Sequence, residues 1–329
     1  MERTCKAASP GPSPLAEAVS ALRRSPEWFV LCHEQPDGDT LGCGSALFMF
    51  GQKLGKTVRW AGPDPIPDSY AFLPGSDRYE TLREISASGN VLLIFVDTSN
   101  PERTLRVKEM PERFSVNIDH HGDNTRFASI NLVDPSAGAT AELVWEMLMG
   151  LEKPLDRGVA IGLYAGLVTD TGRFGYSCTT PRSHRIAAEL LEAGILPEVM
   201  DRLLYSNWTP EALRLRGRAF SRLDYDGVRG VALTWLTRAD FEETGADPSE
   251  TEGLASELMR IRNSRFSAVL IENDTSVRVS LRSRGRPSAA DIAHRHGGGG
   301  HPNAAGMQLP LPLEASLETL KAEIQENDG

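Results

Sequence analysis

The chain has few cysteines, no long apolar run and no surplus of basic residues. Its four cysteines form no C-x-x-C pair, which argues against a disulfide framework or a zinc finger and favours a reducing, cytoplasmic setting. No apolar run approaches the roughly 20 residues that a membrane-spanning helix needs, so we expect no membrane partner. The polar, Pro-rich first dozen or so residues lack the apolar core of a signal peptide and are expected to form a frayed arm.

The 329 residues carry a formal net charge of -10. A protein that tracks long nucleic acid usually carries a basic surplus, because neutralising many phosphates supplies most of the affinity. We therefore expect no long nucleic acid as a partner. An acidic chain still binds a short phosphorylated ligand where the positive charge is local or comes from metal ions, and an excess of carboxylates suits a metal site.

The first half of the chain alternates short apolar runs with amphipathic stretches, which predicts an α/β domain with a largely parallel sheet. A helix is expected over residues 39–55 and a buried helix over 156–169. Thr180 and Thr209 each precede a proline, which predicts two further helix starts. The strands expected in this half and in the last third cover residues 28–33, 56–62, 91–97, 115–119, 128–134, 227–236, 266–274 and 275–283.

The length of the chain suits two domains of ordinary size. We predict a first α/β domain over residues 15–185, a helical connector over 186–224 and a smaller α+β domain over 225–329. Between the last two expected strands, Asn273 and Asp274 predict a hairpin turn.

Potential metal ligands gather at the ends of the expected strands in the first half. His33, Asp37 and Asp39 lie between a strand and a helix. We expect Gly38 to bend the backbone so that the two neighbouring aspartates face different ions. The other candidates follow later strands or end the apolar helix: Asp97, Asp119, His120, His121 and Asp170. Any one of them alone suits a cap or a turn, but the joint pattern is hard to produce by chance.

These groups share one chemical logic. Ligands of an open α/β sheet bind outside the carboxyl ends of its strands, so the groups are expected to converge. Imidazole and carboxylate groups without a thiolate favour Mn²⁺, Mg²⁺, Fe²⁺ or Zn²⁺ over a structural zinc. Two ions about 3.5–4 Å apart are a standard device for phosphoryl displacement. The pattern therefore indicates a two-metal site for phosphate chemistry.

The order His-x-x-x-Asp-x-Asp, strand-end Asp, Asp-His-His and later Asp resembles the four motifs of the DHH phosphoesterases over roughly residues 28–175. The resemblance implies a catalytic domain that binds two metal ions. One ion would be held by His33 and Asp37, the other by Asp39, His120 and Asp170, and Asp97 would bridge both. It also implies that His121 faces the substrate phosphate or the attacking water and that Asp119 orients the motif. Two divalent metal ions are the implied cofactors, Mn²⁺ foremost, with Mg²⁺ or another divalent ion as the alternative.

In the last third, four consecutive glycines at residues 297–300 precede His301. Such a run is not helix or strand material and predicts a loop whose amides approach an anion. Upstream, Arg282 ends an expected strand and suits a bidentate phosphate contact. This part resembles the DHHA1 domain, with its GGGH motif and Ser-Leu-Arg-Ser stretch, over roughly residues 225–310. The resemblance implies a substrate-binding site made of Ser280, Arg282, Gly298, Gly299, Gly300 and His301.

Other candidates are weaker, because each also has a structural explanation. Arg173 suits a phosphate or a nearby carboxylate, and Thr140 and Glu142 lie at a helix start near the expected cleft. His184 is expected on the surface of a connector helix. The tryptophans are expected in the core rather than as base-stacking platforms: Trp60, Trp145, Trp208 and Trp235.

The order and size of the two parts resemble those of the stand-alone nanoRNases and phosphoadenosine-phosphate phosphatases. They imply a Mn²⁺-dependent 3′-5′ oligoribonuclease and nucleotide phosphatase for short oligoribonucleotides and 3′-phosphoadenosine 5′-phosphate, bound between two domains. Hydrolysis of cyclic di-AMP or linear di-adenylate is the alternative, and a non-catalytic nucleotide-binding regulatory module is the alternative of another class. A family II pyrophosphatase lacks the glycine-His loop, and RecJ-like exonucleases are longer. The oligomeric state, a homodimer included, stays open.

Overall fold

The computed structural model describes residues 12–85, 91–104, 106–107 and 115–326, so most of the expected N-terminal arm, with Cys5, lies outside the described residues. The chain divides between Asn207 and Trp208 into two compact units. This boundary falls inside the predicted connector. Within the described ranges, no helix is long and apolar enough to cross a membrane.

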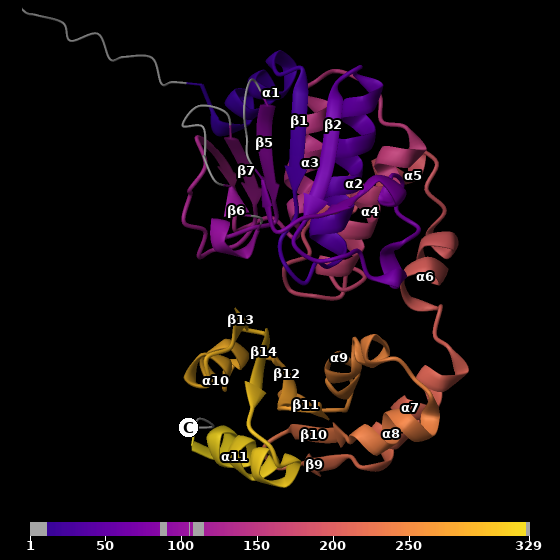
Figure 1. Ribbon diagram of the computed structural model, residues 1–329, viewed down its shortest axis with the longest axis vertical. Coiled ribbons are helices and arrows are strands. Elements are labelled where there is room, and N and C mark those ends of the chain that lie inside the picture. The colour runs from indigo at the N-terminus through magenta and orange to yellow at the C-terminus, as the bar shows by residue number, and fades with distance from the viewer. Residues whose placement is uncertain (1–11, 86–90, 105, 108–114, 327–329) are drawn as a thin grey trace, which may run out of the picture. The chain divides into compact units, whose positions relative to one another are not determined.

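The first unit contains a six-stranded sheet in the order β3-β2-β1-β5-β7-β8, in which every neighbouring pair is parallel (Figure 1). The predicted α/β class with a parallel sheet is therefore confirmed. The short strands β3, β4 and β6 have no sequence pattern that predicts them. Of these, β4 and β6 pair with each other in a separate two-stranded sheet. The strands are β1 (Glu27–Leu31), β2 (Thr57–Gly62), β3 (Glu80–Thr81), β4 (Glu84–Ile85), β5 (Val91–Val96), β6 (Arg106–Val107), β7 (Ser115–Asp119) and β8 (Ile130–Val133).

Both faces of this sheet are covered, which is why β5, with the sequence VLLIFV, is apolar throughout. On one face Ile94 of β5 packs with the helices, and on the other Phe95 packs in a smaller cluster with Phe29 and Ile85. In Figure 1 the helices α2, α3 and α4 lie beside the strands. The helices of this unit are α1 (Pro14–Arg24), α2 (Gly38–Lys53), α3 (Thr140–Met149), α4 (Arg157–Asp170), α5 (Pro181–Glu192) and α6 (Pro197–Tyr205).

The helices α2 and α4 cross at glycines, so their backbones come very close. A Cβ atom on Gly42 would lie 2.3 Å from the carbonyl oxygen of Gly162, and one on Gly166 would lie 2.5 Å from Oδ1 of Asp39. Any larger side chain at these positions would force the helices apart. The crossing thereby brings Asp39, in the first turn of α2, against α4.

The second unit has a six-stranded mixed sheet in the order β13-β14-β12-β11-β10-β9, in which only β10 and β11 pair in parallel. This confirms the predicted smaller α+β part. The strands are β9 (Asp224–Asp226), β10 (Val231–Leu236), β11 (Phe266–Glu272), β12 (Val277–Ser283), β13 (Gly299–His301) and β14 (Ala304–Leu309). The helices are α7 (Pro210–Ser221), α8 (Arg238–Thr244), α9 (Leu254–Leu258), α10 (Ala289–Arg295) and α11 (Leu313–Glu326).

Two hydrophobic clusters hold this second unit, one on each face of its sheet. Leu270 of β11 packs in the cluster of α10 and α11, whereas Val269 packs with Leu215 of α7 in the other. The predicted helix start at Thr209 is confirmed, because its Oγ1 accepts a hydrogen bond from the backbone N of Ala212, at 3.0 Å. The amphipathic helix α7 therefore belongs to the core of the second unit.

The predicted core position of Trp208 was wrong. Its side chain is 49% exposed, and the guanidinium of Arg216 lies 4.0 Å from its ring centroid. Trp60 is fully buried as predicted, whereas Trp145 and Trp235 are partly buried against their cores. Trp208 is the first residue of the second unit.

Candidate metal centre and phosphate site

His33 and Asp37 lie in the loop that joins β1 to α2. Asp37 is the N-cap of α2, and its Oδ1 accepts from the backbone N of Asp39 at 3.0 Å and of Thr40 at 3.2 Å. The same oxygen lies 3.8 Å from Nε2 of His33. Nδ1 of His33 donates to the carbonyl of Glu34 at 2.7 Å, which leaves Nε2 to face the carboxylates. Capping and metal ligation are compatible for Asp37, since a carboxylate has two oxygens.

The predicted backbone role of Gly38 was wrong. Gly38 begins α2 without a positive φ, and the chain adopts a left-handed conformation at Gln35 instead, with a φ of 51°. A Cβ atom on Gly38 would lie 2.5 Å from the side chain of Thr169. Glycine is required there because α2 packs closely on α4.

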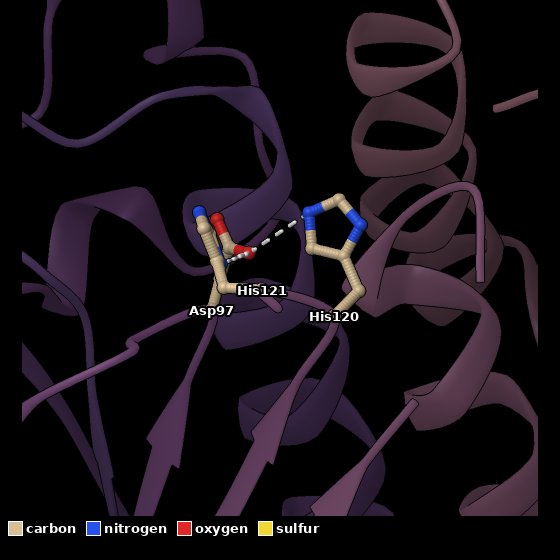
Figure 2. A group of neighbouring side chains, drawn as sticks. All are labelled: Asp97, His120 and His121. Carbon is tan, nitrogen blue, oxygen red and sulfur yellow. Dashed lines mark ion pairs between the residues drawn. The ribbon is translucent and has the colours of Figure 1, made fainter. Parts of the chain in front are cut away.

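Asp97 follows β5 directly and lies at the centre of the candidate metal centre. Its Oδ2 is 3.5 Å from Nε2 of His33, and its Oδ1 is 3.6 Å from Nε2 of His120. Figure 2 shows the ring of His120 directed at this carboxylate. Burial alone raises the pKa of Asp97, but the hydrogen bond from His33 and the charges of His121 and His120 outweigh it and hold the pKa below its usual range. Asp97 is therefore an ionised carboxylate between two imidazoles.

Asp119 ends β7 and is fully buried. Its Oδ1 accepts from the backbone N of His120 at 2.9 Å and lies 2.6 Å from Nδ1 of His121. Its Oδ2 accepts from Nδ2 of Asn124 at 2.5 Å. A carboxylate this close places the proton of His121 on Nδ1, so Asp119 sets both the tautomer and the orientation of that ring.

His120 connects the end of β7 to the end of α4. Its Nδ1 donates to the carbonyl of Ala137 at 3.2 Å, and its Nε2 lies 3.1 Å from Oδ2 of Asp170. Burial lowers the pKa of His120, but the hydrogen bond to Asp170 and the charge of Asp97 outweigh it and raise the pKa to about 11. Burial and the charges of Asp97 and Asp170 raise the pKa of Asp39. Close carboxylates that raise one another's pKa form a site that a cation would stabilise.

Ligand atoms of the described residues form three overlapping groups, and within each group all atoms lie within 4.8 Å of one another. The groups are His33, Asp37 and Asp97; Asp39, His120 and Asp170; and Asp97, His120 and His121. Together with Asp119, these residues are the full set that the DHH resemblance implies for the metal centre. The side chains are positioned to bind a metal ion, and carboxylate with imidazole suits a divalent cation.

Thr140, a weak candidate from the sequence, contacts two of these carboxylates. Its Oγ1 donates to Oδ1 of Asp97 at 2.8 Å, and its backbone N donates to Oδ2 of Asp39 at 2.6 Å. A signal for this contact is present in the sequence. Ala139, the N-cap of α3, has no side chain that could accept from the first turn, so an acceptor must come from elsewhere.

The remaining weak candidates have structural partners. The guanidinium of Arg173 lies 3.7 Å from the ring centroid of Tyr205 and 3.9 Å from Oδ1 of Asp201. The geometry therefore favours the carboxylate alternative for Arg173. His184 is exposed, as predicted, and stacks on Phe174 with ring centroids 4.9 Å apart.

In the second unit, the predicted substrate residues lie on neighbouring strands. Ser280 of β12 pairs with Gly306 of β14, which pairs in turn with Gly299 of β13. Two residues further along β12, Arg282 pairs with Ala304, which pairs with His301 of β13. The side chain of His301 is not among those that the structure describes. The register therefore brings both strand ends and the glycine run together. Nε of Arg282 donates to Oγ of Ser256 at 3.1 Å.

The prediction that the whole glycine run forms a loop was wrong, because Gly299 and Gly300 belong to β13. The reason is steric. Gly300 has a φ of 139°, and a Cβ atom on it would lie 2.5 Å from the carbonyl oxygen of Ala304. A Cβ atom on Gly298 would lie 2.2 Å from the carbonyl oxygen of Gly306. Strand pairing this tight excludes side chains, so the low strand propensity of glycine does not decide here.

Two family domains match the chain, the N-terminal domain of the DHH family over residues 27–167 and the DHHA1 domain over residues 230–327. The chain therefore belongs to the DHH family, which is metal-dependent, and both predicted resemblances are confirmed.

The chain is 35% identical over 302 residues to the bifunctional oligoribonuclease and PAP phosphatase NrnA of Thermus thermophilus, covering 91% of this chain and 89% of that protein. It is 29% identical over 299 residues to the NrnA of Bacillus subtilis, which has the same description, covering 88% of this chain and 92% of that protein. The crystal structure of an exopolyphosphatase-related protein from Bacteroides fragilis matches with a TM-score of 0.87 at 24% identity, covering 95% and 96% of the two chains. This last likeness concerns the fold alone.

Proposed function

We propose that the chain is a two-metal, Mn²⁺-dependent phosphoesterase that hydrolyses short oligoribonucleotides and 3′-phosphoadenosine 5′-phosphate. The observation that carries the proposal is the position of Asp97, with His33 Nε2 at 3.5 Å from one oxygen and His120 Nε2 at 3.6 Å from the other. A carboxylate with its two oxygens turned to different imidazoles suits a bridge between two cations. The names of the two NrnA relatives support the substrate class.

The donor groups fit two divalent cations. His33 and Asp37 would hold one, Asp39, His120 and Asp170 the other, and Asp97 both. When bound, the cations would activate the attacking water and neutralise charge on the phosphate. Backbone carbonyls of Glu34 and Ala137 hold the Nδ1 protons of His33 and His120, which keeps each Nε2 available as a ligand.

His121 has a separate role in this proposal. Its Nδ1 is engaged by Asp119 at 2.6 Å, so that nitrogen is not available to a cation. We assign its Nε2 to the substrate phosphate or the attacking water. Because Asp119 is fully buried and also held by Asn124, it orients His121 rigidly. We therefore assign His121 as the catalytic contact and Asp119 as its support.

The second unit would supply the substrate contacts. Arg282 offers a guanidinium for a phosphate, and it lies on β12, which β14 separates from the glycine run of β13. Ser280, Gly298, Gly299, Gly300 and His301 complete the proposed site. We further propose a cytoplasmic setting, which the free thiols of Cys32, Cys43 and Cys178 support.

The test is a turnover panel with Mn²⁺ on the full chain. The substrates are 3′-phosphoadenosine 5′-phosphate, linear di-adenylate, a five-residue RNA, cyclic di-adenylate and pyrophosphate, with a metal-chelated sample as the control. We expect turnover of the first three. A preference for the cyclic dinucleotide or for pyrophosphate would replace the substrate assignment. Binding without turnover of any substrate would favour the regulatory module.

A further inference from the structure

The first turn of α3 is bonded to the candidate metal centre although it supplies none of the ligands. The backbone N atoms of Thr140 and Ala141 donate to the two carboxylate oxygens of Asp39, at 2.6 and 3.0 Å. The N-cap, Ala139, has no capping side chain. Asp39 therefore takes the place of a cap, and the positive end of the helix dipole faces its negative charge. Both oxygens of Asp39 are held in a defined direction as a result.

The side chain of Thr140 acts on the second carboxylate. Thr140 is fully buried and Asp97 is 2% exposed, and the hydroxyl of Thr140 donates to Oδ1 of Asp97 at 2.8 Å. Asp97 has a φ of 57°, a backbone conformation that is uncommon outside glycine. With Oδ1 held by Thr140, the plane of the carboxylate is set, and Oδ2 is left 3.5 Å from Nε2 of His33.

An ion pair between Glu142 and Arg182, whose side chain is 27% exposed, links this turn of α3 to α5. Glu142 is fully buried, and its Oε1 accepts from Oγ of Ser183 at 2.5 Å. Its Oε2 lies 3.3 Å from Nε of Arg182, which also reaches Glu146 at 2.8 Å and Asp134 at 3.1 Å. A buried carboxylate of this kind contributes little net stability but fixes geometry when all its partners are in place.

We infer that Thr140 is a positioning residue of the metal centre: its amide and hydroxyl orient Asp39 and Asp97 for divalent cations, and the Glu142, Ser183 and Arg182 network holds it there. The inference rests on the proposed function, because it takes Asp39 and Asp97 as ligands. Loss of the hydroxyl leaves the ligands in place but lets the carboxylate of Asp97 rotate.

The test compares Thr140→Val, which keeps the shape and loses the hydroxyl, with Thr140→Ser, which keeps the hydroxyl. Mn²⁺ affinity is measured by calorimetry and the environment of the bound ions by electron paramagnetic resonance. Loss of an outer hydrogen bond to a ligand typically weakens metal affinity about 10–100-fold, which we expect for Thr140→Val. Thr140→Ser should remain within about threefold of the wild type. Thermal unfolding without metal shows that each variant is folded.

The outcomes separate this inference from the proposed function. A wild-type protein that takes up no divalent cation would overturn the proposed function itself. A wild type that binds Mn²⁺ with a Thr140→Val variant of equal affinity and spectrum would overturn the inference alone, as would a Thr140→Ser variant as weak as Thr140→Val. If Thr140→Val does not fold, Thr140→Ala gives the same comparison, because alanine is a strong helix former.

Discussion

In the first unit the candidate residues lie where buried parallel strands and a buried helix end, whereas in the second they lie along β12 and on the edge strand β13 of a mostly antiparallel sheet. The first set is rich in carboxylates that raise one another's pKa, as at Asp39. The second set brings a guanidinium and a glycine run together. The difference indicates a division of labour, in which one unit suits cations and the other suits phosphate.

Glycine also serves the two units differently. In the first unit Gly42 and Gly166 let two helices approach, which brings Asp39 against α4. In the second, Gly298 and Gly300 let a strand pair where a Cβ atom would meet a carbonyl oxygen. In one unit glycine lets two helices pack closely, and in the other it lets two strands pair closely.

The largest effect is expected at the centre of the first unit. Asp97→Asn keeps the shape but removes the charge between the two imidazoles, so we expect kcat to fall by about 10³-fold or more and bound Mn²⁺ to fall with it. Steady-state kinetics and metal analysis measure both. Asp201→Asn, which changes a half-exposed carboxylate 3.9 Å from Arg173, is the control and should retain activity. Turnover near the wild-type level with Asp97→Asn would refute the two-metal assignment.

The second unit should respond in substrate binding instead. Arg282→Ala removes a charge-assisted contact of about 1.5–3 kcal/mol, which corresponds to a rise in KM of about 10–100-fold. We expect kcat to change much less and Mn²⁺ affinity not to change. Arg282→Lys should be intermediate, since it keeps the charge without the planar fork. An unchanged KM, or a loss of metal, would contradict the division of labour; the control is Arg238→Ala, an exposed arginine paired with Asp274 at 3.1 Å.

A smaller effect is expected within the glycine run, where the first and the last position differ in their surroundings. Gly300→Ala places a Cβ atom 2.5 Å from the carbonyl oxygen of Ala304, so β13 should detach from β14 and KM should rise about tenfold. Gly297→Ala meets no atom within 4 Å and has a φ of 72°, so only conformational strain of about 1 kcal/mol applies. Equal KM values for the two variants would show that the pairing of β13 is irrelevant to binding.

The smallest effect concerns the stability of the second unit. Burial alone raises the pKa of Asp240, but Arg222 and the hydrogen bonds from Thr237 outweigh it and hold the pKa at about 2, below the ordinary 3.8. Because the folded-state pKa is depressed, the stabilisation is fully present above about pH 4 and is lost as pH falls toward 2. Asp240→Asn should therefore lower the free energy of unfolding by about 2 kcal/mol at pH 6 and by less at pH 3.

Urea unfolding across this pH range measures that difference. Asp274→Asn changes a carboxylate that is 88% exposed and should alter the free energy of unfolding by less than about 0.5 kcal/mol at either pH. A difference between wild type and Asp240→Asn that stays constant from pH 6 to pH 3 would contradict the depressed pKa.

The candidate metal centre could be predicted because its residues obey a rule that is visible in sequence. His33, Asp97 and His120 each follow a strand that the sequence predicts, and parallel strands bring their carboxyl ends to one edge. The contacts of Thr140 with Asp39 and Asp97 could not be predicted in this way, because they depend on where α3 packs. The role of Gly38 could not be predicted either, because the side chain that excludes a Cβ atom there belongs to Thr169, more than a hundred residues further along the chain.

The parallel class of the first sheet, the family motifs and the candidate ligand groups could all be predicted from the sequence, because apolar periodicity and residue spacing are local properties of the chain. Three features depend on the tertiary structure: which oxygen of Asp97 faces which imidazole, the capping of the first turn of α3 by Asp39, and the strand formed at Gly299 and Gly300. Those outcomes depend on contacts between segments far apart in the chain. Close packing selects among local preferences there, and no short stretch of sequence contains both partners.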